Sequence, residues 1–157
     1  MIDQDLFRAV LGRFASGVTV VTTRDQDGTP HGMTVSAFAS LSLDPPLVLI
    51  CVANDATMTP LLAHVEQFAV NVLSSTQEAM SRRFAGKSDD RFVGIGFHDG
   101  RTGIPVLDDV LAWLQCKIVA RYPSGDHVLI VGQVEHADVG DGRPLLYYRG
   151  GYAMLER

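Results

Sequence analysis

The chain has 157 residues, of which 46% are hydrophobic and 20% charged, and its formal net charge is −5 at pH 7. This charge disfavours non-specific binding to nucleic acid, which requires a basic surface. No apolar run approaches the ~20 residues that a helix needs to span a bilayer, and the acidic N-terminus does not resemble a secretory signal. A chain of this length buries roughly 70% of its unfolded surface, so we expect residues 1–157 to form one domain.

Apolar periodicity, β-branched runs and turn residues predict the order of the elements. They are a helix over 3–16, strands over 18–23, 29–36 and 45–53, a short helix over 59–64, a strand over 68–73, a helix over 77–85, strands over 111–122 and 127–137, and a last short strand over 144–152. The first helix is expected to begin at an Asp3 cap and to end at Gly17, and residues 86–106 to form a long surface loop. Strands mostly follow strands, so the chain is predicted to be mainly β with flanking helices, as a closed antiparallel barrel of six or seven strands.

The two cysteines, Cys51 and Cys116, lie in separate apolar runs, and no C-x-x-C motif is present. They are predicted to be buried free thiols in a reducing compartment, and we expect a cytoplasmic protein. None of the five histidines has the spacing of zinc ligands, so no metal site is predicted. A Walker loop, a G-x-S-x-G elbow and a G-x-G-x-x-G fingerprint are also missing, so a nucleotide would bind without a Rossmann loop.

The stretch over residues 32–46 has an unusual polarity for a strand region. Its hydroxyl residues Thr34, Ser36, Ser40 and Ser42 all fall on even positions. Alternate residues of an extended chain face the same side, so short donor and acceptor groups would line one face. Such a face suits a large planar ligand with polar edges.

Three other sets of polar residues each allow two interpretations, a ligand contact or a purely structural role. Thr57 and Thr59 precede a helix start, where hydroxyls and backbone N–H groups can bind phosphate, or where Thr59 simply caps the helix. The arginines Arg82 and Arg83 could reach a phosphate or could form an exposed basic helix end. His127 next to Asp126, and the segment 147–151, could contact a nucleotide or could serve only the local turn and edge packing.

The chain resembles the flavin reductase-like family, whose members adopt a split β-barrel that binds FMN or FAD. The resemblance is carried, in order, by residues 14–22, 32–46, 68–73, 83–85, 112–116, 125–127 and 144–148. It is most similar to the small reductase components of two-component flavin monooxygenases. It implies an antiparallel split β-barrel, a homodimer, a separate oxygenase partner, and an NAD(P)H:flavin oxidoreductase.

The resemblance also implies roles for individual residues. The flavin would be contacted by Thr34, Val35, Ser36, Ser40, Leu41, Val52, Ala53, Asn54, Thr57, Thr59, Arg83, Phe84 and Ala85. The nicotinamide nucleotide would be contacted by His127, Tyr148, Arg149 and Gly150. Some relatives carry a lysine where this chain has Asn54-Asp55, and Arg83 and Lys87 are the candidates to replace its charge.

Hydride transfer from nicotinamide to flavin needs binding and orientation more than a protein acid or nucleophile, so no catalytic side chain is predicted. The sequence has no arginine cluster for a 2′-phosphate, which favours NADH over NADPH. FMN and FAD are not distinguished. The alternatives are a flavin-binding protein that holds FMN without reductase turnover, and a small-molecule oxidase on the same barrel.

Overall fold

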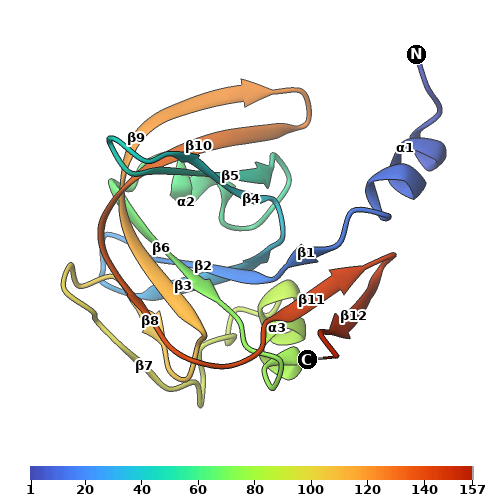
Figure 1. Ribbon diagram of the computed structural model, residues 1–157. Helices are drawn as coiled ribbons and strands as arrows, with labels where there is room; N and C mark the ends of the chain where they lie inside the picture. The colour runs from blue at the N-terminus through green and yellow to red at the C-terminus, as the bar shows by residue number, and fades with distance from the viewer. Residues whose placement is uncertain (157) are drawn as a thin grey trace.

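The computed structural model describes residues 1–156 (Figure 1). The elements are α1 (Gln4–Leu11), β1 (Ser16–Gly17), β2 (Thr19–Arg24), β3 (Pro30–Val35), β4 (Phe38–Ser42), β5 (Leu47–Ala53), α2 (Thr59–Leu62), β6 (Gln67–Val72), α3 (Glu78–Ala85), β7 (Phe97–His98), β8 (Val106–Leu107), β9 (Ala112–Ser124), β10 (His127–Val139), β11 (Leu145–Tyr148) and β12 (Gly151–Met154). Within this part of the chain, no helix has the length and apolar character that crossing a membrane demands.

Seven strands form one antiparallel sheet in the order β3-β2-β6-β9-β10-β5-β4. The sheet curls round on itself, and its two edge strands, β3 and β4, are joined by Ser36 and Ala37 (Figure 1). No ladder joins β3 to β4 among the strands described, so the barrel is split there. The mainly β antiparallel fold and the split barrel that the resemblance implies are therefore confirmed, whereas the closed barrel expected from the order of the strands is wrong.

The barrel interior follows from the alternation of side chains along the strands. In β5, Val48, Ile50 and Val52 are buried while their neighbours are half-buried, which is the period of two of a strand with one face in the core. Phe68 of β6 and Ile130 of β10 meet them in one cluster. Burial of apolar surface in this cluster supplies the main driving force for closing the sheet.

A second apolar cluster, separate from the first, lies between the start of β2 and the helix α3. It contains Val18, Val20 and Phe84, with Phe92 packed against it. The rings of Phe84 and Phe92 meet edge to face, with centroids 5.1 Å apart. This cluster fixes α3 beside the edge strand β3.

The N-terminal helix is shorter than predicted. Asp3 caps it as expected, because its carboxylate accepts hydrogen bonds from the N–H groups of Asp5 and Leu6. The helix ends at Leu11 with Gly12 as its cap, and Ser16–Gly17 instead forms strand β1 against β11. The apolar pattern continues to Phe14, but the low helix propensity of Gly12 ends the helix first.

Three further expectations need correction. Thr59 is the first residue of α2 rather than its cap, which is Met58. The expected loop over 86–106 contains β7, which pairs with β8 and adds a two-stranded ribbon. The last strand is a hairpin, in which β11 turns at Arg149 and Gly150, both with positive φ, into β12.

Buried polar side chains fasten the segment 99–107 to the sheet. The Asn71 amide donates to the Val20 carbonyl and to the Thr22 hydroxyl, and its oxygen accepts the N–H of Leu107. Gln115 donates to the Asp99 and Ile104 carbonyls. Asn71, a polar residue in the apolar strand β6, thus has a structural role, because it satisfies backbone groups that burial would otherwise leave unpaired.

Candidate functional site

A continuous groove runs along the edge strand β3, which we call the β3 groove. Three cavities make it up, and successive residues of β3 belong to each in turn. Residues 30–32 line a cavity of about 450 Å³, Met33 and Thr34 a cavity of about 240 Å³, and Thr34 with Ser36 a cavity of about 200 Å³. Helix α3 and the segment 55–58 form the facing wall.

The middle cavity carries two groups suited to an anion. The Thr57 hydroxyl and the Lys87 ammonium both line it, and no hydrogen bond or ion pair among residues 1–156 uses either group. Arg91 lines the same cavity, but its guanidinium already donates to the Phe84 and Gly86 carbonyls at 3.1 Å. Partial burial lowers the pKa of Arg91, because desolvation penalises its charged form. A phosphate here would complete an otherwise unsatisfied set of donors.

The cavity at the end of β3 is lined by small hydroxyl residues and by two tyrosines of the terminal hairpin. Thr34 donates its hydroxyl hydrogen to the Ser81 carbonyl, and the Ser81 hydroxyl is 2.7 Å from that of Tyr152. Tyr147 meets Tyr152 edge to face, with centroids 5.4 Å apart. Of the hydroxyl row expected on residues 34, 36, 40 and 42, Thr34 and Ser36 line this cavity, whereas Ser40 and Ser42 lie on β4 at the other edge of the sheet and do not.

A neighbouring cavity of about 310 Å³ shares Ala85, Tyr147 and Tyr152 with this one, and adds Arg82 and Gly150. The guanidinium of Arg82 lies 4.8 Å from the centroid of the Tyr152 ring. Two cavities thus meet at the same pair of aromatic rings. A planar ligand in one would lie next to a ligand in the other.

The structure brings some of the predicted flavin contacts together and separates others. Thr34, Ser36, Thr57, Phe84 and Ala85 line the β3 groove. The buried Val35 and Val52 point into the interior, and Ser40 and Leu41 are exposed on β4 at the other edge of the sheet. None of these four residues lines a cavity of the groove.

Three more predicted flavin contacts are engaged with the protein itself. The Thr59 hydroxyl donates to the Ala53 carbonyl, and Asn54 donates to the Gly125 carbonyl. The Arg83 guanidinium donates to three carbonyls of the segment 90–93. Arg83 therefore shapes the loop beyond α3, and the free positive charge in the cavity is that of Lys87.

Of the predicted nicotinamide contacts, Gly150 lines a cavity beside the groove. His127 is at the tip of the β9–β10 hairpin, where it pairs with Asp126 at 2.6 Å. This hydrogen bond lowers the pKa of Asp126. Tyr148 and Arg149 are exposed and line none of these cavities, so for these three residues a nicotinamide role stays a prediction.

Sequence reasoning missed Arg91, Ser81 and Tyr152 as groove residues. Arg91 sits in the segment expected to be a plain loop. Tyr152 was expected at the end of a single strand over 144–152, whereas it lies in the return strand β12 beside Tyr147. The recurrence of an aromatic residue after a Gly-Gly pair would have indicated a return strand, and thus Tyr152 beside Tyr147.

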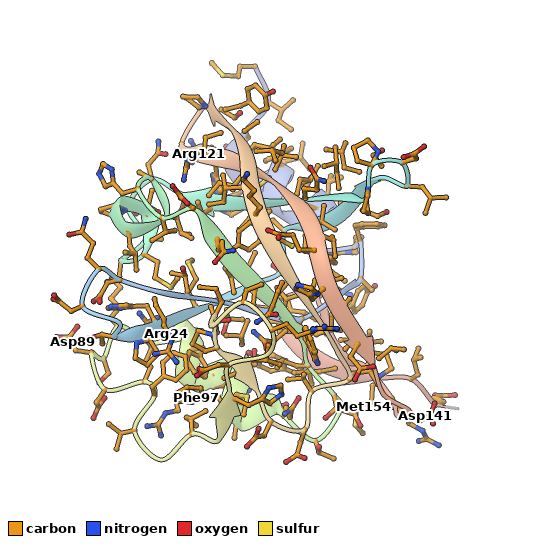
Figure 2. All side chains as sticks on the ribbon, turned by 90° about the vertical axis from the view of Figure 1, so that its left-hand side faces the viewer. Arg24, Asp89, Phe97, Arg121, Asp141 and Met154 are labelled. Atoms are coloured by element: carbon orange, nitrogen blue, oxygen red, sulfur yellow. The ribbon has the colours of Figure 1, made fainter. Side chains whose placement is uncertain are left out.

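A further cavity, of about 530 Å³, lies beyond the groove at the β2–β3 turn and involves Arg24 and His64. Arg24 is held by Asp99 and lies 5.8 Å from the ring centroid of Phe97; Figure 2 labels Arg24 and Phe97. Among residues 1–156, no group of three acidic, histidine or cysteine side chains is arranged to hold a metal ion.

Comparison with known proteins agrees with this architecture. The family model described as flavin reductase like domain matches residues 11–156. The NADH-dependent flavin reductase of a Rhodococcus species is 44% identical over 95% of this chain and 85% of its own length. An NADH:FAD oxidoreductase of Streptomyces globisporus, solved in complex with NAD and FAD fragments, superposes with a TM-score of 0.91 at 39% identity, over 96% of this chain and 92% of its own.

One relative is much longer than this chain. The probable flavin reductase of Rhizobium meliloti is 41% identical over 97% of this chain, but the chain spans only about half of its length (49%). The flavin reductase of Pseudomonas putida, 40% identical, is covered over 89% of its length. The match over nearly all of the sequence, together with the split antiparallel barrel, places this chain in the flavin reductase-like family.

Proposed function

We propose that this chain is an NADH-dependent flavin reductase, formed by one domain over residues 1–157, which supplies reduced flavin to a separate monooxygenase. The observation that carries the proposal is the β3 groove, where a hydroxyl-lined cavity adjoins one with the unpaired Thr57 hydroxyl and Lys87 ammonium. A flavin mononucleotide has this sequence of groups, a planar polar ring followed by a phosphate. A 39% identical relative is the reductase subunit of a flavin-dependent monooxygenase in Mycobacterium tuberculosis.

The residues of the groove would position the flavin. Lys87 and Thr57 would bind the phosphate, and Thr34 and Ser36 would line the ring cavity. The ring supplies the redox chemistry when bound, because it accepts a hydride from the nicotinamide. The protein contributes orientation: the paired rings of Tyr147 and Tyr152 line both this cavity and its neighbour, so ligands in the two cavities would lie next to each other.

A homodimer is part of the proposal. On α1, Leu6, Phe7, Val10 and Leu11 are each at least half exposed, and none of the helix is buried. The helix stands away from the barrel at the end of an extended segment (Figure 1). A one-sided apolar helix of this kind is stabilised when it packs on a partner. The two free cysteines accord with action in a reducing cytoplasm.

The deciding experiment measures NADH oxidation by the purified protein as FMN or FAD is added. We expect turnover that saturates with flavin, and faster turnover with NADH than with NADPH. The competing function is a flavin-binding protein without reductase turnover. Tight flavin binding with no NADH oxidation above that of free flavin would replace the first proposal by the second.

A further inference from the structure

The β3 groove is longer than a mononucleotide requires. If the ring lies at residues 34–36 and the phosphate at Thr57 and Lys87, the cavity lined by residues 30–32 is left over. At roughly 3.3 Å per residue, the extended segment from residue 36 to residue 30 spans about 20 Å. This remaining cavity, which we call the outer cavity, is the largest of the three, at about 450 Å³.

The outer cavity is joined to the phosphate cavity rather than separate from it. Thr57, Met58 and Arg91 line both. A ligand that leaves the phosphate cavity along β3 therefore passes directly into the outer cavity. Arg91 is half-buried and lines both cavities, so its guanidinium would lie next to a ligand group in either one.

The walls of the outer cavity suit a nucleoside. Phe92 lines it, and its ring is held edge to face against Phe84 at 5.1 Å and Phe97 at 5.4 Å, so it offers a fixed apolar surface to a base. Asp25 and His31 also line the outer cavity, and the Asp25 carboxylate is 2.8 Å from a ring nitrogen of His31. A carboxylate is the usual acceptor for ribose hydroxyls in dinucleotide sites.

The charges of the cavity restrict the ligand further. Asp25 and Asp89 line the outer cavity, and Asp55 lines the phosphate cavity, while the positive groups are Lys87 and Arg91. Two cations beside the shared wall match a diphosphate. Carboxylates at the far end disfavour a further phosphate there and favour a neutral sugar and base.

We propose that the outer cavity binds the adenosine half of FAD, and that this chain therefore selects FAD over FMN. The inference rests on the proposed flavin reductase function and names the flavin that the same groove takes. Asp25 would accept hydrogen bonds from the ribose, Phe92 would pack against the base, and Arg91 would contact the diphosphate.

Calorimetric titration of the flavin-free protein with FAD and with FMN tests this. We expect FAD to bind about tenfold more tightly or better. Two variants act on the outer cavity alone: His31→Ala removes a wall group, and Thr29→Trp fills the space from an exposed position. Both should weaken FAD binding about tenfold and leave FMN binding unchanged. His64→Ala, at an exposed histidine that lines only the neighbouring large cavity, is the matched control and should change neither.

The outcomes separate the two proposals. Equal affinities for FAD and FMN, or variants that weaken both flavins alike, would overturn the outer cavity as the adenosine site. Selective FAD binding without NADH oxidation would retain that site and overturn the reductase function. Absence of any flavin binding would overturn both.

Discussion

Replacing Asn71 by leucine should destabilise the protein more than any exposed asparagine would. Asn71 is fully buried and makes three hydrogen bonds, at 2.9 Å to the Val20 carbonyl, 3.1 Å to the Thr22 hydroxyl and 2.9 Å from the Leu107 N–H. Leucine has a similar volume but leaves these groups unpaired in the interior. A buried unpaired polar group costs about 1–3 kcal/mol, so we expect a loss of about 3 kcal/mol in the free energy of unfolding.

Urea denaturation followed by circular dichroism measures this loss, and the same change lowers Tm by about 6–12 °C in a chain of this length. The matched control is Asn54→Leu, because Asn54 is exposed and makes only a 3.3 Å hydrogen bond to the Gly125 carbonyl. We expect that control to stay within about 0.5 kcal/mol of the wild type. A similarly small effect of Asn71→Leu would refute the idea that this side chain fastens the segment 99–107.

Three other predictions follow from the site and the packing. Lys87→Gln should weaken FMN binding about fivefold and leave riboflavin binding unchanged, measured by titration. Gly132→Ala should cost about 1–3 kcal/mol on urea denaturation, since its Cβ would lie 2.7 Å from Phe68, whereas Gly17→Ala has open space. The hydrogen bond from His31 lowers the pKa of Asp25 in the folded protein. The ionised Asp25 therefore stabilises the fold fully above its unfolded pKa, and this contribution is lost as the carboxylate is protonated in acid. Asp25→Asn lacks this contribution, so its free energy of unfolding should fall less between about pH 5 and pH 2 than that of the wild type.

Each of these three predictions has a result that would contradict it. Equal weakening of FMN and riboflavin by Lys87→Gln would mean that the lysine does not contact the phosphate. A Gly132→Ala protein as stable as Gly17→Ala would mean that the sheet relaxes around the added methyl group. An unchanged acid limb in Asp25→Asn would mean that this carboxylate is not responsible for the acid sensitivity.

The strands could be predicted because their signal is local. The alternation along β5 and the β-branched run of β2 indicate burial on one face or both, whatever the neighbouring strands are. The end of α1 was misplaced because apolar side chains continue to Phe14, whereas the competition between Gly12 and β1 pairing depends on strand β11, far along the chain. Pairing partners of this kind leave no trace in the local pattern.

The candidate site was predictable only in part, for a related reason. Thr34 and Ser36 could be found from their spacing, and Thr57 from its place before a helix. Arg83 was expected at the phosphate, but it donates to the carbonyls of 90–93, so that among residues 1–156 Lys87 is the cation of this cavity with no partner. A sequence shows which residues carry charge, but the partner that neutralises each charge is set by the folded loop.

The position of β3 has a consequence for solubility. It is an edge of the seven-stranded sheet, and an open edge can pair with another chain and start aggregation. Helix α3 packs against β3, and the Thr34 hydroxyl donates to the Ser81 carbonyl of that helix at 2.7 Å. The other edge, β4, is interrupted by a register shift between Ser40 and Ser42. Helix α3 therefore both forms a wall of the ligand groove and covers the β3 edge against pairing with other chains. Substitutions that loosen α3 to widen the groove will also expose this edge.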